Sequence, residues 1–288
     1  GLILMTTNLP ATASEMTDHE IAMLSGTVAP EQQSNLAIFA INYLEEDRDD
    51  VDISKYRGHF AIHNGTEKVY GLEPTYKILG ASNQVRHYDA TANNGDGAYV
   101  AETIFFDNPF NMKAEDTAGT LRCGKVSKKE RELLSPGDQE LQSKMKVYRI
   151  TWGIVNMVGV NAAGEEAVAT NIPCMMRSGG KGFMPMSDYL EANAGNVHNI
   201  VTTFRTTLHK KPIKHWEVQP VMGEDARLTD VELETMKALM EEKQKWNREV
   251  MTKWRKANGI VESKPLSEVS EEFSAVLIDS DVDDEIPF

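Results

Sequence analysis

One short run of the sequence combines cations with aromatic rings: Lys144, Lys146, Tyr148, Arg149 and Trp152. Basic side chains bind phosphate groups and aromatic side chains stack on nucleobases, and proteins use these two devices together to hold single-stranded nucleic acid. Side chains of a strand alternate with a period of two, so both lysines, Tyr148 and Trp152 would share one face if no bulge intervenes. That face would form a stacking groove. The alternative is a half-buried strand whose Trp152 belongs to the core.

A glycine-rich segment, residues 177–183, offers a second site for phosphate. Its three glycines allow a close backbone approach, and Arg177, Lys181 and Phe183 add two charges and a ring. The segment is not a P-loop, because Lys181 is followed by glycine rather than by serine or threonine. A surface turn without a ligand is the alternative.

A third basic segment surrounds Pro212. Arg205, Lys210 and Lys211 precede or flank this proline, and Trp216 follows it. Cations interleaved with an aromatic ring again suit a single strand. The alternative is a solvated loop.

The chain ends in three acidic residues followed by an isoleucine, a proline and a phenylalanine. Such a tail has too little apolar surface to fold alone. Its proline limits the unbound conformations, and its terminal ring suits a basic pocket with an apolar floor on another protein. The residues that we expect to bind a partner are Asp281, Asp283, Asp284, Glu285, Ile286, Pro287 and Phe288.

This terminus resembles that of bacterial single-stranded-DNA-binding proteins, whose acidic tails end in Asp-Asp-Asp-Ile-Pro-Phe. Glu285 replaces the third aspartate and keeps its charge. The resemblance is confined to the end of the chain, which lacks the Gly/Gln/Pro-rich linker of the bacterial proteins, and it suggests a divergent, phage-encoded form. It implies an oligonucleotide-binding barrel, single-stranded DNA as the ligand, and replication, recombination or repair proteins as partners.

The charge distribution is compatible with a polyanionic ligand although the formal net charge is −14. Residues 1–54 carry a net charge of −9 and residues 263–288 one of −7, whereas residues 55–222 carry +3. A chain with this polarity can bind phosphate through its middle while both ends are repelled.

Sequence motifs for a catalytic, metal or membrane function are missing. The seven histidines form no HExxH pattern and the two cysteines, Cys123 and Cys174, form no CxxC spacing. We therefore expect no enzyme activity, metal or cofactor. No apolar stretch approaches the length of a membrane span, and the separated cysteines fit a reducing compartment, so the sequence predicts a soluble cytoplasmic protein without membrane partners.

The elements that must position these residues are mostly short strands. Strand-like runs are His59–Ile62, Tyr76–Leu79, Val85–Tyr88, Tyr99–Phe106, Met145–Val160, Ala167–Met176, Thr202–Leu208 and His215–Val221. Met145–Val160 is the strongest, and Gly153 marks a bulge or bend inside it. Helices are expected over residues 127–142 and 187–194. Without a βαβ rhythm, the pattern favours an antiparallel barrel or sandwich.

A long amphipathic helix is expected over residues 228–258. Thr229 and Glu232 fit a capping box, apolar residues recur at helical spacing, and Gly259 is a natural stop. This helix either docks on the β-domain or joins two copies of the chain in a homo-oligomer.

Together with the resemblance, the sequence predicts a mainly β chain, α+β overall, with an OB-fold-like antiparallel barrel over residues 35–222. Residues 1–34 would form a flexible arm, and residues 263–288 a disordered acidic tail. The expected function is a non-enzymatic protein that coats single-stranded DNA in replication, recombination or repair and recruits partners through its tail. The alternatives are a strand-annealing or recombination mediator, and an acidic interaction protein that mimics DNA or occupies the tail-docking pockets of host enzymes.

Overall fold

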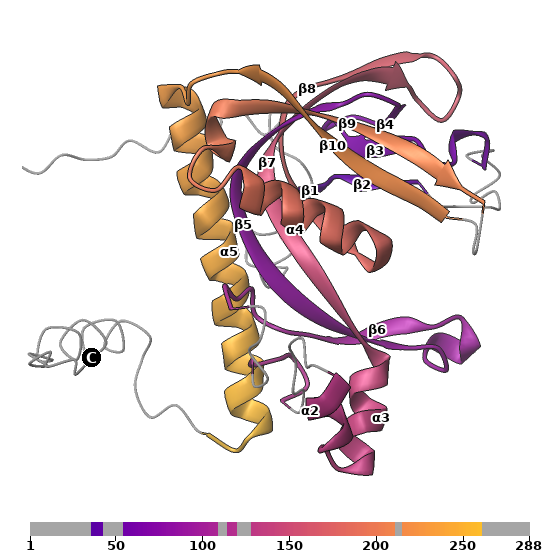
Figure 1. The fold of residues 1–288 in the computed structure, drawn as a ribbon, viewed down its shortest axis with the longest axis vertical. Helices are drawn as coiled ribbons and strands as arrows, with labels where there is room; N and C mark the ends of the chain where they lie inside the picture. The colour runs from indigo at the N-terminus through magenta and orange to yellow at the C-terminus, as the bar shows by residue number, and fades with distance from the viewer. Residues whose placement is uncertain (1–35, 43–53, 109–113, 120–127, 211–214, 261–288) are drawn as a thin grey trace, which may run out of the picture. The chain divides into compact units, whose positions relative to one another are not determined.

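Two long antiparallel strands, β5 (Thr75–Asp89) and β7 (Met145–Val160), form the centre of the fold (Figure 1). β-Branched and aromatic residues are frequent in β7, which favours an extended conformation. The bounds of β7 are those that the sequence predicts, whereas β5 joins two predicted strands into one. The computed structural model describes residues 36–42, 54–108, 114–119, 128–210 and 215–260.

A meander of shorter strands continues the sheet from β7. β8 (Glu166–Gly179) pairs antiparallel with β7 on the edge opposite β5. β4 (Lys68–Gly71) pairs with the end of β7 and with β3 (Phe60–His63), which pairs with β2 (Ala40–Ile41). β1 (Ala37–Ile38) runs parallel to β8.

Three further strands pair with β5 or follow it in the sheet. β6 (Ala98–Glu102) pairs with the distal end of β5. β9 (Ile200–His209) pairs with the first two residues of β5 and forms an antiparallel hairpin with β10 (His215–Asp225). The main path through the sheet is β10-β9-β5-β7-β4-β3-β2, with β6, β8 and β1 off this path. Apart from the parallel β1–β8 pair the named strands pair antiparallel, so the described chain is mainly β with an antiparallel sheet, as the sequence predicts.

The helices differ in part from the expected ones. They are α2 (Lys128–Glu132), α3 (Pro136–Lys144), α4 (Phe183–Ala192) and α5 (Asp230–Ala257), with 3-10 turns at Ser54–Tyr56, Asn93–Gly95, Gly180–Gly182 and Val197–Asn199. The sequence predicts one helix where α2 and α3 lie. A second helix starts there because the Ser135 side chain accepts a hydrogen bond from the Asp138 N–H and Pro136 occupies the first helical position.

Helix α5 confirms the predicted long C-terminal helix and packs on the sheet. Thr229 and Glu232 form the capping box. Leu239 and Val250 are buried. Asn247 accepts a hydrogen bond of 2.8 Å from the backbone N–H of Phe105 and donates one of 3.1 Å to its carbonyl oxygen. Docking on the β-domain, the first of the two alternatives, is therefore what the described residues show.

The main core is built around four aromatic rings from different strands and from the residue between β1 and β2. Phe39, Phe60, Tyr76 and Phe204 lie with ring centroids 5.3–6.1 Å apart, and all four are fully buried. Rings at these separations attract one another beyond the hydrophobic gain of their burial.

A β-bulge at Leu79 changes the face that the side chains of β5 occupy. The sequence predicts a bulge or bend at Gly153 of β7. The extra residue is on the partner strand, where Ile78 pairs with Gly153 and Gly80 pairs with Trp152, so that Leu79 between them has no partner in β7. A Cβ atom on Gly153 would lie 2.1 Å from the carbonyl oxygen of Lys77, so only glycine fits here. Because side chains alternate, one extra residue moves the even-numbered side chains of β5 to the other face beyond the bulge.

All residues that the structure describes belong to one compact unit that starts at Leu36. The predicted arm over residues 1–34 and the predicted tail over residues 263–288 lie outside the described residues. In the described part of the chain, no helix is long and apolar enough to cross a membrane.

Candidate nucleic-acid interface

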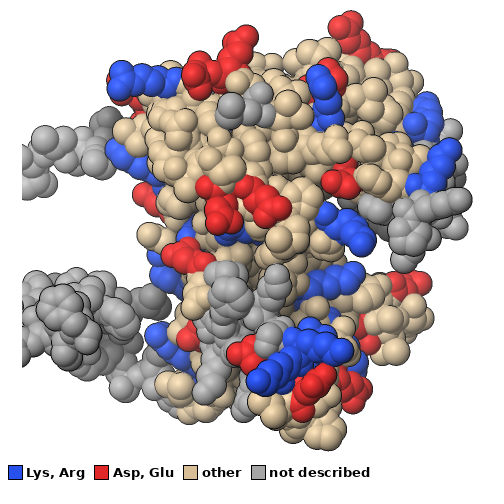
Figure 2. All heavy atoms as spheres, in the orientation of Figure 1, with Lys and Arg blue, Asp and Glu red and all other residues tan. Residues whose placement is uncertain are grey.

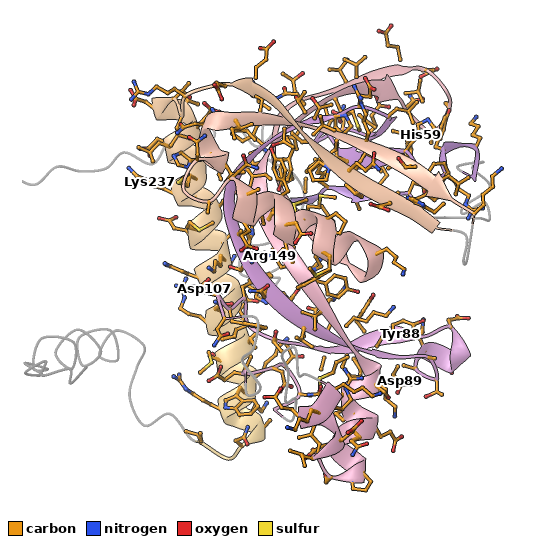
Figure 3. All side chains as sticks on the ribbon, in the orientation of Figure 1. His59, Tyr88, Asp89, Asp107, Arg149 and Lys237 are labelled. Atoms are coloured by element: carbon orange, nitrogen blue, oxygen red, sulfur yellow. The ribbon has the colours of Figure 1, made fainter. Side chains whose placement is uncertain are left out.

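Three tyrosines from neighbouring strands lie together where β5, β6 and the start of β7 meet. We call Tyr88, Tyr99 and Tyr148 the tyrosine platform. The ring centroids of Tyr88 and Tyr99 are 5.3 Å apart, and those of Tyr99 and Tyr148 are 6.5 Å apart. Figure 3 shows Tyr88 near β6, away from Arg149 and Asp107, which lie closer to α5.

The register of the strands explains this grouping. Beyond the bulge at Leu79, Gln84 lies opposite Tyr148 and Arg86 lies opposite Lys146, and directly opposed residues of two strands share a face. A second irregularity lies in β6. Arg86 opposes Glu102, but Tyr88 opposes Tyr99, one residue off the simple alternation. Both irregularities are needed to bring the platform to one face.

Tyr99 is the member of the platform that offers the most surface to a ligand, with 37% of the residue exposed. Its hydroxyl shares a hydrogen bond of 2.6 Å with that of Tyr148. Burial and this hydrogen bond raise the pKa of Tyr148, so its phenol stays neutral at physiological pH. The ring of Tyr148 rests on Gly179, where a Cβ atom would lie 2.5 Å from a ring carbon.

Cationic side chains surround the platform. The guanidinium carbon of Arg86 lies 3.5 Å from the ring centroid of Tyr99 and 5.8 Å from that of Tyr148. The ammonium group of Lys146 lies 5.1 Å from the ring centroid of Tyr88. Figure 2 shows Lys and Arg side chains on the surface next to the β6 region. Positive charge beside aromatic rings is the combination that binds single strands.

Arg177 of β8 forms the floor of this cluster. Its Nε donates a hydrogen bond of 3.0 Å to Oε1 of Gln84, and the fully buried Gln84 donates one of 3.3 Å to the carbonyl oxygen of Thr103. Burial and the nearby charge of Arg86 lower the pKa of Arg177, while Glu102 opposes this shift. Arginine keeps its charge under such shifts, so Arg86 and Arg177 bring two positive charges close to Glu102, which forms its hydrogen bond with Arg86.

The structure brings together residues that the sequence placed in two separate segments. Lys146 and Tyr148 come from the first run, and Arg177 comes from the glycine-rich segment, which meets Tyr148 at Gly179. Lys181 is exposed in the turn that follows β8, and Phe183 is half-buried at the first position of α4.

Three residues of the first run do not lie in the predicted groove. Trp152 is only 1% exposed and packs edge-on against Phe105 at 5.0 Å, so its predicted stacking role is wrong and the core alternative is correct. Lys144 ends α3, where it pairs with Glu140 at 3.3 Å, and so lies outside the strand. Strand β7 begins at Met145, directly after Lys144, because Lys144 belongs to the last turn of α3.

Arg149 is also turned away from the platform. As an odd-numbered residue of β7, it lies on the opposite face from Tyr148. Its Nη1 donates a hydrogen bond of 2.8 Å to the carbonyl oxygen of Ser82, and burial lowers its pKa. The predicted DNA contact of Arg149 therefore does not fit this face.

The third basic segment makes different contacts. Arg205 of β9 pairs with Glu73 at 3.0 Å. The half-buried ring of Trp216 packs on Gly58, where a Cβ atom would lie 2.6 Å from it. Lys210 is exposed at the end of β9, and Lys211 lies outside the described residues. These contacts place Arg205 and Trp216 around the β4–β5 bend and the start of β3.

Sequence reasoning missed Arg86, Tyr88, Tyr99 and Glu102. The signal that was available is the position of Arg86 and Tyr88 on one face of the predicted strand Val85–Tyr88. Tyr99 carried no such signal, because its partnership depends on the irregular register of β6.

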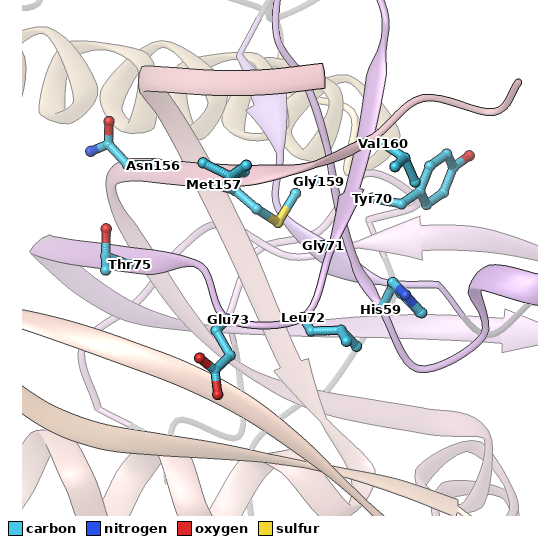
Figure 4. Close-up of a pocket in the computed structure, with 11 residues that line it drawn as sticks. His59, Tyr70, Gly71, Leu72, Glu73, Thr75, Asn156, Met157, Gly159 and Val160 are labelled. Carbon is cyan, nitrogen blue, oxygen red and sulfur yellow. The ribbon is translucent and has the colours of Figure 1, made fainter. Parts of the chain in front are cut away.

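A separate cavity of about 660 Å³ lies between the β4–β5 bend and β7 (Figure 4). Apolar side chains dominate its rim, where Leu72 is 56% and Val158 is 69% exposed. His59 and Glu73 also line it. Glu73 of this cavity pairs with Arg205, and the exposed side chains of the rim are apolar. The cavity is therefore a poorer match for a polyanion than the tyrosine platform.

The described residues contain no group of three or more His, Cys, Asp or Glu side chains that would hold a metal ion. Comparisons of the chain with known protein families, with curated proteins and with solved structures found no match.

Proposed function

We propose that this protein binds single-stranded DNA through the tyrosine platform and the cations around it, without catalysing a reaction. The observation that carries the proposal is the arrangement of Arg86, Lys146 and Arg177 around three tyrosine rings on one face of the sheet. Basic groups would bind the phosphates, and the exposed ring of Tyr99 would stack on a base. The role would be to coat exposed strands in replication, recombination or repair.

The strand pairings support a small barrel within the sheet. The segment Ala37–Ile41 pairs with β8 through β1 and with β3 through β2. Since β3 pairs with β4, β4 with β7 and β7 with β8, these pairings form a closed ring. If β1 and β2 are taken as one strand, the five strands pair in their order along the chain, with β5 and β6 left out of the ring, whereas oligonucleotide-binding barrels have a Greek-key order. The proposal therefore concerns a barrel of similar build rather than the same topology.

Recruitment of partner proteins by the acidic tip Asp281–Phe288 remains part of the proposal and rests on the sequence. Burial of Ile286 and Phe288 would contribute about 1.5–3 kcal/mol each before ordering costs. Exposed ion pairs would add roughly 0–1 kcal/mol each. Such a contact is weak, and many copies on one strand would raise its effective concentration.

Replacing Tyr99 by alanine should weaken the binding of oligo-dT roughly 5-fold to 150-fold, because a stacked base contributes about 1–3 kcal/mol. Tyr99→Phe keeps the ring and loses only the hydrogen bond to Tyr148, so it should stay within about threefold of the unchanged protein. Fluorescence anisotropy of a labelled oligo-dT measures both variants.

Salt dependence separates the ring from the charges. The slope of log affinity against log salt concentration is negative. It should be unchanged in Tyr99→Ala and should become shallower by about 0.7 in Lys146→Ala, which loses one phosphate contact. If both variants bound oligo-dT like the unchanged protein while Trp216→Ala lost binding, the interface would lie on the β9–β10 hairpin instead.

A further inference from the structure

One acidic side chain is built into the candidate interface and holds its central cation. Oε1 of Glu102 accepts a hydrogen bond of 2.6 Å from Nε of Arg86. The side chains of Arg86 and Glu102 are 19% and 18% exposed, so the pair is largely shielded from water. The same guanidinium group covers the ring of Tyr99.

Phosphate and carboxylate bind a guanidinium group in the same way, through charge-assisted hydrogen bonds. A strand whose phosphate is to bind Arg86 must therefore compete with Glu102. Shielding from water makes this competition stronger than it would be for a surface ion pair, because the charges are screened less.

Arg177 is held differently. The oxygen bound to its Nε is the neutral amide oxygen of Gln84, and that amide is fixed in turn by Thr103. Of the two arginines beside the tyrosine platform, Arg86 is thus held by a carboxylate and Arg177 by an amide. A ligand with phosphates alone gains from the second arginine but must displace Glu102 from the first.

We propose that Glu102 competes with phosphate for Arg86 and so weakens the binding of every phosphodiester ligand, with the result that a strand must also stack bases to bind tightly. This inference rests on the proposed function. A ligand that also stacks a base on Tyr99 gains about tenfold in affinity per base, which offsets the displacement of Glu102. A duplex or a strand without bases offers phosphates only and does not recover that loss.

The test compares three ligands of equal length: oligo-dT, an abasic phosphodiester strand and a DNA duplex. Glu102→Gln should bind the abasic strand and the duplex about tenfold more tightly, equivalent to about 1.4 kcal/mol. It should bind oligo-dT more tightly by a similar factor, because all three ligands have to displace Glu102 from Arg86. Glu102→Asp, which keeps the charge but withdraws it from Arg86, should raise the three affinities in the same direction by a smaller factor. Asp96→Asn removes an exposed acid from the β5–β6 turn and controls for net charge.

The outcomes are distinct. If Glu102→Gln changed all three affinities by the same factor as Asp96→Asn, competition by Glu102 would be wrong, although oligo-dT binding through Tyr99 would still support the proposed function. If the unchanged protein bound neither oligo-dT nor the abasic strand, both proposals would fail. Thermal unfolding of each variant establishes that it is folded at the temperature of the titration.

Discussion

Trp152→Ala should lower the free energy of unfolding by about 3–5 kcal/mol, the usual loss when a fully buried large aromatic side chain is truncated. The indole is 1% exposed and contacts Phe105, and the ammonium group of Lys243 lies 5.6 Å from its ring centroid. The variant would lose these contacts and leave a cavity between the sheet and α5. Urea unfolding, followed by circular dichroism, measures the change.

The affinity of Trp152→Ala for oligo-dT tests whether the indole of Trp152 belongs to the interface or to the core. At a temperature at which Trp152→Ala is still folded, its affinity for oligo-dT should remain within about threefold, because the indole does not reach the platform. Leu133→Ala is the control for stability, since Leu133 is 82% exposed and should change the free energy by no more than about 0.5 kcal/mol. A strong loss of binding with little loss of stability would return Trp152 to the stacking groove.

Lys77→Ala should destabilise the fold by about 3 kcal/mol, because it leaves the partner of a buried ion pair without its counterion. Nζ of Lys77 lies 2.9 Å from the carboxylate of Glu232 and donates a hydrogen bond of 3.2 Å to the carbonyl oxygen of Arg227. Lys77 is 6% exposed and the Glu232 side chain 19%, which places the loss at the lower end for buried pairs. The pair attaches the start of α5 to β5.

The pH dependence of stability provides an independent measurement of this pair. Burial alone would raise the pKa of Glu232, but the hydrogen bonds from Lys77 and Thr229 outweigh it and lower the pKa below its ordinary value of 4.5. The stabilisation is therefore complete above that value and is lost as the pH falls through the folded-state pKa. In Lys77→Ala this acid-dependent loss should shrink, as urea unfolding at pH 7 and at about pH 4 would show.

Lys237→Ala is the matched control on the same helix (Figure 3), because Lys237 pairs with Glu234 at 3.1 Å but the two side chains are 62% and 73% exposed. Such an exposed pair contributes about 0–1 kcal/mol. Equal losses in Lys77→Ala and Lys237→Ala would show that the buried pair has no special role.

Local patterns predicted the elements that depend on local chemistry. The β-branched residues of Met145–Val160 gave the bounds of β7, and the capping box at Thr229 gave the start of α5. The strand of residues 68–71 and the break between α2 and α3 were missed, because a four-residue strand and one proline are weak signals beside tertiary packing.

The candidate site was predicted only in part, for a physical reason. Lys146, Tyr148 and Arg177 were named from their residue types, but the partners of Tyr148 come from β5 and β6. Trp152 was placed in the groove because alternation gives the face of a residue and not its depth, and the face of β7 that carries Tyr148 passes into the core at Ile150.

The bulge at Leu79 has a consequence for how this surface is encoded. The platform depends on the phase of a strand as much as on side chains, so the loss of a single codon at Leu79, far along β5 from Tyr88, would rotate Arg86 and Tyr88 to the reverse side of the ribbon. Every side chain of the site would still be present in such a protein, and the surface would be gone. In a lineage of such chains, insertions and deletions in β5 would therefore be more damaging to binding than many substitutions within the site itself.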